Sequence, residues 1–388
     1  MPWQKVSPVD LRFEFNQAYA TGFLSMTDLC DQFGISRRTG YKWLGRFEAE
    51  GRRGLADRSR RPHTSPRATD PAIVERLCAA RRQHPTWSAR KLIAVLRRHD
   101  PAGLWPARST GCAVLKAHGL VRARRRRDRA RAPAVPLAPI TRPNEVWTTD
   151  FKGEFRTGDG AYCYPLTLRD GFSRYVLRCD ALVTKRSEVV RDRFARAFAE
   201  YGLPDRIRSD NGGPFAAPGL TRLSHLSVWW IRLGIHPERI ALGHPEQNGS
   251  HEQFHRVLKA ETTRPAAPTR AAQQQRFRRF RTEYNDERPH EALRDQVPAS
   301  CYRPSARAWP RQLPALEYPG HMEVRRVSAI GHVSWRGRAL YLTEVLGGQE
   351  VAFEEVDDGI WLLHFATVRL ARFDERSRTL MAVNYALG

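Results

Sequence analysis

The stretch GHPEQNGSHEQFHRVLKAE, residues 243–261, is loop-like at its start and helical at its end. Pro, Asn and two Gly among its first seven residues favour a turn, whereas the remainder has the composition of a helix. On that helix the spacing i, i+3, i+7 places Glu252, His255 and Lys259 on one face. Phe254 and Leu258 point elsewhere and can anchor the helix to a core. The stretch therefore predicts a glutamate held on a rigid helix.

Glu246 is the other acidic residue that this stretch offers as a ligand. It lies in the loop, where its position is less well fixed, so we favour Glu252 on grounds of rigidity. The simpler alternative for Glu252 is a surface side chain beside Lys259.

Two aspartates end predicted strands upstream of this helix. Asp150 follows Trp147-Thr148-Thr149, and Asp210 closes RIRSD just before Asn211-Gly212. Catalytic groups of α/β sheets lie at strand ends, and Asn-Gly allows a sharp turn there. An aspartate before such a turn is also a common turn residue, so Asp210 carries little weight alone.

The two aspartates and Glu252 together supply the oxygen ligands that Mg²⁺ prefers. Two such ions, about 3.5–4 Å apart, activate a water or a 3′-hydroxyl and stabilise the leaving oxygen of a phosphodiester. Without metal ions the carboxylates would repel one another, and we expect raised pKa values. This chemistry explains acidic residues inside a basic protein.

The chain of 388 residues has a formal net charge of +24 and is 41% hydrophobic, values of a basic globular protein with two to four domains. Residues 1–133 contain 28 Lys and Arg against 11 Asp and Glu. Such an excess favours a nucleic acid partner, because clustered cations release counterions when they meet phosphates. A soluble protein with a basic bias is the alternative.

The basic N-terminal third has the pattern of two helix-turn-helix units. Ser25 and Ser36 can cap successive helices around a turn at Gly34, and the aromatics of the second helix are expected to pack inward. Ser88 and Ser109 can cap helices of a second unit, between Asp70-Pro71 and Gly119. A plain three-helix bundle with a charged face is the alternative for the first unit. The residues expected to contact DNA from its second helix are Arg37, Arg38, Thr39 and Lys42.

Five segments follow from these patterns. Residues 1–60 and 61–121 are the two helical units, and residues 122–140 are a basic, proline-rich linker that includes Arg124, Arg125, Arg126 and Arg127. The linker arginines either stay solvated or lie on phosphates. Residues 141–305 show three strands and then alternating helices and strands, which predicts a mixed α/β sheet. Residues 306–388 are β-rich, with a hairpin at Asp357-Asp358-Gly359, and predict a small SH3-like barrel.

Six cysteines are far apart and lack the spacing of a zinc site, which favours free thiols and a reducing compartment. No signal peptide and no run of apolar residues long enough to span a bilayer is evident. We expect a bacterial cytoplasmic protein, associated with the nucleoid and without a membrane partner.

The motifs WTTDFKG, SDNGGPF and PEQNGSHEQFHRVLKAE resemble those of DDE transposases and retroviral-type integrases, and YNDERPHEAL resembles the segment that follows them in insertion-sequence transposases. The intervals of 60 and 42 residues between Asp150, Asp210 and Glu252 fit this resemblance. It implies a multidomain α+β protein with an RNase H-like core, in which these three carboxylates hold two Mg²⁺ or Mn²⁺ ions. The His and Cys pairs of the retroviral zinc-binding N-terminus are absent, so no zinc is expected.

The resemblance also assigns positions around the carboxylates. Lys259 becomes a contact to the DNA backbone, and His255 is expected to meet DNA on the same helix face. The positions expected to shape the site are Asn211, Gly212, Asn248 and Gly249.

The leading hypothesis is a transposase that binds the inverted repeats of its element, cleaves at the ends and joins them to target DNA, assembled on double-stranded DNA as a dimer or higher oligomer. A DNA-binding regulator that keeps the fold without the chemistry is the alternative. An RNase H-like nuclease without strand transfer is disfavoured by the two predicted DNA-binding units.

Overall fold

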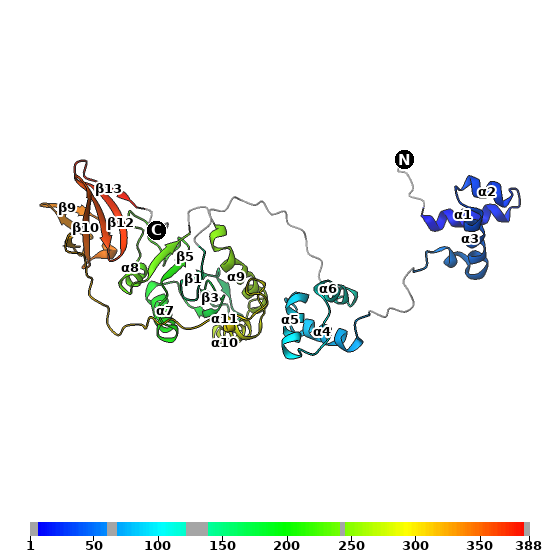
Figure 1. The fold of residues 1–388 in the computed structure, drawn as a ribbon, viewed down its shortest axis with the longest axis horizontal. Coiled ribbons are helices and arrows are strands. Elements are labelled where there is room, and N and C mark those ends of the chain that lie inside the picture. The colour runs from blue at the N-terminus through cyan, green and yellow to red at the C-terminus, as the bar shows by residue number, and fades with distance from the viewer. Residues whose placement is uncertain (1–6, 60–67, 122–138, 241–244, 384–388) are drawn as a thin grey trace. The chain divides into compact units, whose positions relative to one another are not determined.

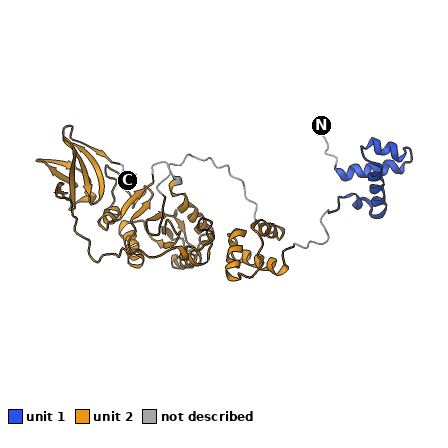
Figure 2. Ribbon diagram, in the orientation of Figure 1, with its two compact units in different colours: residues 1–68 blue, residues 69–388 orange. Residues whose placement is uncertain are grey.

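The computed structural model describes residues 7–59, 68–121, 139–240 and 245–383 (Figure 1). The chain divides into two compact units, residues 1–68 and 69–388 (Figure 2). The second unit therefore includes the second helical bundle, the α/β core and the β-rich tail.

The first unit contains three helices and a short 3₁₀ turn. They are α1 (Pro8–Ala20), α2 (Met26–Gln32), α3 (Arg37–Glu50) and η1 (Gly51–Leu55). Ser25 and Ser36 cap α2 and α3 by accepting a backbone N–H three residues on, and Gly34 turns between them with φ 65°. These caps are the ones that the sequence predicts. Trp43 is buried as expected, but Tyr41 is 56% exposed, so the prediction that the α3 aromatics all pack inward is wrong for Tyr41.

The second bundle consists of α4 (Pro71–Gln83), α5 (Ala89–His99) and α6 (Arg108–Ala117). Asp70 and Ser88 stand at the N-caps of α4 and α5, as the sequence predicts. Ser109 does not cap α6, because this helix begins one residue earlier, with Ala107 at its N-cap. The bundle closes over Leu77, Leu92 and other apolar side chains.

This second bundle makes polar contacts with the α/β core. Arg90 of α5 pairs with Glu291 and Asp295, at 2.6 and 2.9 Å. His84 lies 3.1 Å from Glu283. The segment expected to be a separate domain is thus joined to the core within one unit.

The core is built on a mixed six-stranded sheet, as the sequence predicts. Its order is β2-β3-β1-β5-β6, with β4 paired to β3. β1 runs antiparallel to β3 and parallel to β5. The strands are β1 (Val146–Phe151), β2 (Phe155–Arg156), β3 (Tyr162–Asp170), β4 (Val176–Leu182), β5 (Arg206–Ser209) and β6 (His236–Arg239).

Helices cover both faces of this sheet because its strands alternate apolar side chains between two clusters. One cluster joins Trp147 and Leu166 to α7 (Ser187–Tyr201) and α8 (His225–Arg232). The other joins Cys163 and Cys179 to α9 (Gly249–Thr262) and α10 (Arg270–Thr282). Phe254 and Leu258 of α9 belong to the second cluster, which confirms their predicted role as anchors. Short turns surround these helices: η2 (Pro245–Asn248), η3 (Glu283–Glu287), η4 (Glu291–Leu293) and α11 (Pro298–Cys301).

The tail does not form the SH3-like barrel that the sequence suggested. Its described strands make an open antiparallel sheet of order β13-β12-β11-β10-β7 and a separate hairpin, β8-β9. The predicted turn at Asp357-Asp358-Gly359 does join β10 to β11, with Gly359 at φ 70°. The elements are β7 (Glu323–Arg326), β8 (His332–Trp335), β9 (Arg338–Tyr341), η5 (Glu344–Leu346), β10 (Glu350–Asp357), β11 (Ile360–Phe365), β12 (Val368–Asp374) and β13 (Thr379–Ala382).

One face of the tail sheet is covered both by the β8–β9 hairpin, through Val333 and Trp335, and by residues of the core. Leu223, Val228 and Ile231 share a buried cluster with Phe353 and Leu363 of the tail. On the other side of α8, Trp229 and Trp230 belong to the core cluster. A helix that is apolar all round is expected to be buried on both sides, and α8 is.

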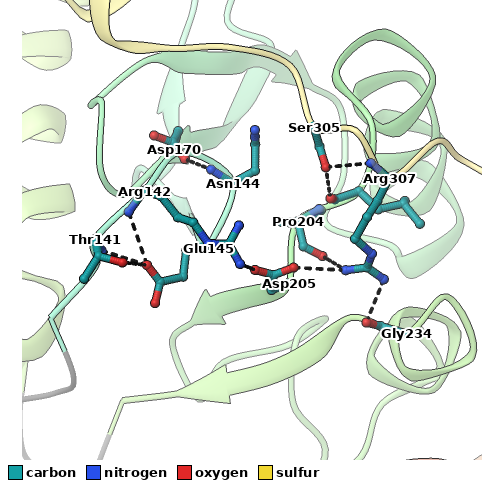
Figure 3. A network of polar contacts seen from close by, with 11 residues as sticks. Thr141, Arg142, Asn144, Glu145, Asp170, Pro204, Asp205, Gly234, Ser305 and Arg307 are labelled. Atoms are coloured by element: carbon teal, nitrogen blue, oxygen red, sulfur yellow. Dashed lines mark hydrogen bonds and ion pairs between the residues drawn. The ribbon is translucent and has the colours of Figure 1, made fainter.

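A polar network fixes the two ends of the core (Figure 3). Asp205 lies between two arginines and pairs with Arg142 at 2.6 Å and Arg307 at 3.4 Å. Arg307 also donates to the carbonyl oxygens of Pro204 and Gly234. The chain that leaves the core is therefore tied to the start of β5 and to the turn after α8.

Candidate active site

The two aspartates lie at one edge of the sheet. Asp150 is the penultimate residue of β1, and Asp210 directly follows β5. Because β1 and β5 are parallel neighbours, their carboxyl ends meet at the same edge. Glu252 lies in the first turn of α9, exposed, on the helix that packs against this sheet.

Electrostatics show that the carboxylates act on one another. Burial and the negative charge of Asp210 raise the pKa of Asp150 to about 7, and Glu252 adds a smaller repulsion. Burial also raises the pKa of Asp210, although the Gly212 N–H donates to its Oδ1 at 3.2 Å. The predicted rise in pKa is thus found for both aspartates.

In the part of the chain that the structure describes, no three His, Cys, Asp or Glu side chains are grouped closely enough to hold a metal ion. Asp150 and Asp210 nevertheless fit a divalent cation, since they offer hard oxygen donors and repel one another when both are ionised. A cation between them would remove that repulsion. Glu252 is near enough for its charge to raise the pKa of Asp150.

Two histidines of α9 form a polar layer against the sheet. His251 Nε2 and His255 Nε2 lie 2.7 and 2.8 Å from the Thr167 hydroxyl, which donates to the Asp150 carbonyl at 3.0 Å. His251 Nδ1 lies 2.9 Å from the Thr148 hydroxyl. With its own proton given to the carbonyl, the Thr167 hydroxyl accepts from both rings.

The prediction that His255 contacts DNA is wrong for this structure. Its side chain is 8% exposed and its Nδ1 faces Asp150 Oδ2 at 3.5 Å. Burial and the nearby cations Lys152 and Arg169 lower the pKa of His255 to about 3, so the ring is neutral. With Nε2 donating to Thr167, Nδ1 presents a lone pair toward Asp150 and can accept a hydrogen bond from the protonated carboxyl group.

A cationic group that the sequence reasoning missed lies beside the aspartates. Burial and the charges of Lys259 and Arg264 lower the pKa of Lys152, whereas Asp150 opposes that shift. Lys259 is exposed, as a DNA contact requires. Lys152 stands two residues after Asp150 in WTTDFKG, and that proximity was the available signal.

Two of the four positions expected to shape the site have structural reasons, those of Asn211 and Gly212. Asn211 donates to the Ile240 carbonyl at 2.9 Å and so links the end of β5 to that of β6. A side chain at Gly212 would meet the Asp210 carboxylate at 3.1 Å. Asn248 is the buried N-cap of α9, without a side-chain capping bond. A Cβ at Gly249 would meet nothing within 4 Å, so no close contact requires this glycine.

The expected DNA contacts of the first unit lie on its surface. Arg37, Arg38 and Lys42 are exposed on the first turns of α3, and Lys42 also covers the Trp43 ring at 4.4 Å. Thr39 is half-buried, and its N–H donates to Ser36. The linker arginines 124–127 lie outside the described residues, and so does the side chain of Glu246.

Comparison with known families matches three parts of the chain. Residues 140–245 and 233–298 match two integrase core domain families, and residues 18–83 match the leucine zipper of insertion element IS481. An insertion element IS407 protein of Burkholderia multivorans is 29% identical over 182 residues, which cover 46% of this chain and 62% of that protein. The chain therefore contains an integrase-like core and is similar to an insertion-element protein. It spans less than two thirds of the length of this relative.

The integrase-like core has viral relatives as well. A Gag-Pol polyprotein of avian reticuloendotheliosis virus is 33% identical over 118 residues, which cover 30% of this chain and 10% of the polyprotein. Among solved structures, a simian T-cell lymphotropic virus intasome chain is 15% identical, with a TM-score of 0.38, covering 75% of this chain and 98% of its own. The HTLV-2 integrase catalytic core domain in complex with magnesium is 15% identical, with a TM-score of 0.31, covering 42% of this chain and 98% of its own.

The matched leucine-zipper segment is not one continuous helix in this chain. Its described part contains the end of α1, then α2, α3 and the whole of α4, separated by turns. No described helix is long and apolar enough to cross a bilayer.

Proposed function

We propose that this chain is a transposase that binds the terminal inverted repeats of its insertion sequence, cleaves DNA there and joins the ends to target DNA. One observation carries the proposal: within the matched integrase core, Asp210 is close enough to Asp150 to help raise its pKa to about 7. Such a shift at a strand edge is typical of a functional site. The RNase H-like assignment of the core is part of this proposal.

We infer that Asp150, Asp210 and Glu252 hold two Mg²⁺ or Mn²⁺ ions. When bound, these ions supply an activated oxygen nucleophile and stabilise the leaving oxygen of a phosphodiester. Asp150 gives up its proton as a cation binds, and His255 Nδ1, 3.5 Å from Asp150 Oδ2, is placed to orient that proton beforehand. Because the His255 ring is neutral, it adds no positive charge that would compete with a cation.

DNA contacts are assigned to the cations around these carboxylates and to the N-terminal units. Lys152 and Lys259 can meet the backbone phosphates that approach Asp150. Arg37, Arg38, Thr39 and Lys42 of α3 would recognise the element ends, with the linker arginines 124–127 on the backbone. Because transposition joins two ends, we expect at least a dimer on DNA.

The test is a nicking and strand-transfer assay on duplex DNA that carries the element ends, with Mg²⁺ or Mn²⁺. Asp210→Asn should abolish both reactions while leaving DNA binding intact. The matched control is Asp192→Asn, an exposed aspartate of α7 outside the site, which should cut like wild type. Equal activity of wild type and Asp210→Asn would contradict the proposal.

A DNA-binding regulator without the chemistry is the second candidate. It is favoured by the lack, among the described residues, of three acidic or histidine side chains grouped as a metal site. Wild type that binds the ends but cuts no DNA with either metal would support the regulator.

A further inference from the structure

A cavity of about 610 Å³ lies beside the N-terminus of α9, on the side of β3 that carries Arg169. Its basic lining comes from Lys91 of α5 and from Arg169, Arg174 and Arg288 of the core. Glu291 is the only carboxylate in the described lining, and it pairs with Arg90 at 2.6 Å. The cavity therefore has a large positive excess that its own wall does not neutralise.

Arg169 is the least solvated of these cations. It is 1% exposed, and its Nη2 and Nη1 donate to the Oγ and the carbonyl of Ser250, at 2.6 and 3.2 Å. Its Nε has no hydrogen-bond partner among the described residues. Arg174 donates to the same Ser250 Oγ. Two guanidinium groups thus share one neutral oxygen, and the nearby Asp170 carboxylate offsets part of their charge without an ion pair to either within the described chain.

The other two cations add to the same positive field. Arg288 pairs with Glu261 at 2.6 Å, but its Nε has no partner in the described structure. Burial and the charge of Arg288 lower the pKa of Lys91 to about 8. Burying cations without compensating anions is unfavourable, and a bound anion would offset that cost.

The end of α9 supplies a further preference for negative charge. This helix has 14 residues, and its N-cap Asn248 makes no side-chain capping bond. The free N–H groups and the helix dipole at such an end favour an anion. Arginine forks match the oxygens of a phosphate especially well.

We propose that this cavity binds a phosphate group. In the DNA-bound protein this group is a backbone phosphate of the DNA strand that enters the active site. This second statement rests on the proposed transposase function. Free phosphate and a phosphodiester share the chemistry that the cavity recognises.

The position of the cavity favours the DNA backbone as the source. Arg169 stands two residues after Thr167 on β3, and the Thr167 hydroxyl donates to the Asp150 carbonyl. Two strand residues span roughly 7 Å, so the positions of Arg169 and Thr167 are close neighbours on one face of β3.

The experiment uses the full chain in metal-free buffer, with Arg174→Gln and Lys91→Gln as variants. Arg311→Gln, an exposed arginine outside the cavity, is the matched control. Titration calorimetry with inorganic phosphate at constant ionic strength gives the affinity of the cavity. Binding of end-containing duplex DNA over a range of salt concentrations gives the number of phosphate contacts.

We expect wild type and Arg311→Gln to bind phosphate equally, and both cavity variants to bind it about tenfold more weakly. For Arg174→Gln the salt slope of DNA binding should fall by about 0.9. No phosphate binding by wild type, or unchanged affinity in both variants, would overturn the proposal. Weakened phosphate binding with an unchanged DNA slope would overturn the assignment to the DNA backbone.

Lys91→Gln keeps the test valid should Arg174→Gln fail to fold, because Lys91 lies on α5, outside the core sheet. A nicking assay separates this proposal from the proposed function. If wild type cuts DNA and the cavity variants bind phosphate and DNA as wild type does, the phosphate-binding proposal is wrong and the proposed function stands. If wild type cuts no DNA but the variants bind phosphate more weakly and show the lower salt slope, the proposed function is wrong and the phosphate-binding proposal stands.

Discussion

Replacing Asp150 by Asn should stabilise the metal-free protein, and more so at high pH. The pKa of Asp150 is raised from 3.8 to about 7 in the folded state. Below about pH 4 the residue is protonated in both the folded and unfolded states, and the shift has no effect on stability. Between about pH 4 and 7 the unfolded chain loses this proton while the folded chain keeps it. The free energy of unfolding of wild type therefore falls as pH rises through this window.

The size of the effect follows from the pKa shift. A shift of about three units corresponds to about 4 kcal/mol above pH 7, at 1.36 kcal/mol per unit. Between pH 5 and pH 8 the linkage relation gives about 2.5 kcal/mol. The side chain is 18% exposed, and solvent screening reduces this value, so we expect about 1–3 kcal/mol. Asn cannot ionise, so Asp150→Asn lacks this component.

The assay is urea unfolding of wild type and Asp150→Asn at pH 5 and pH 8, with EDTA present and tryptophan fluorescence as the probe. The readout is how much the stability difference between the two proteins widens from pH 5 to pH 8. Any constant effect of the amide cancels in that comparison. Asp192→Asn, at an exposed position of α7, should show a difference that changes by less than about 0.5 kcal/mol. Parallel pH profiles for wild type and Asp150→Asn would refute the reasoning.

Three further predictions concern other parts of the chain. Glu252→Gln should abolish cleavage in the nicking assay and spare DNA binding, whereas Glu246→Gln should have the smaller effect; the reverse order would show that the loop supplies the third carboxylate. Lys42→Gln should lower the salt slope of DNA binding by about one, and an unaltered slope in filter binding would move recognition away from α3. Phe353→Ala should cost about 3–5 kcal/mol of unfolding free energy by urea titration, because this ring is fully buried and packs 4.3 Å from the Trp335 ring; a loss below about 1 kcal/mol would contradict the packing described.

Local signals predicted the elements well because their causes are local. Ser25, Ser36 and Gly34 set helix ends through their own backbone geometry, and the structure has those ends. The strand ends at Asp150 and Asp210 followed from short apolar runs that stop at turn residues. Tertiary contacts explain the errors. The tail strands lacked any local sign that α8 would add Val228 and Ile231 to the buried cluster on their sheet.

The burial of His255 shows the limit of predicting side-chain exposure from helical periodicity. At 100° per residue, His255 is turned about 60° from Glu252 around the axis of α9, whereas Lys259 is turned only about 20°. That difference leaves Glu252 and Lys259 exposed and turns His255 into the sheet. Its partner is the Thr167 hydroxyl, 88 residues away in sequence. No spacing rule within one helix reveals a polar partner on a distant strand.

The two buried histidines bear on why a basic protein can keep an acidic pair at this edge. Hydroxyls of β1 and β3 satisfy the rings of His251 and His255, so α9 can lie close to the sheet without adding a cation beneath the carboxylates. Burial lowers the pKa of both rings, and burial raises the pKa of Asp150. Burial of this layer thus keeps one proton on Asp150 and leaves His251 and His255 neutral. A protonated Asp150 relieves repulsion from Asp210 until a cation takes that role, which makes cation binding and proton release one linked event.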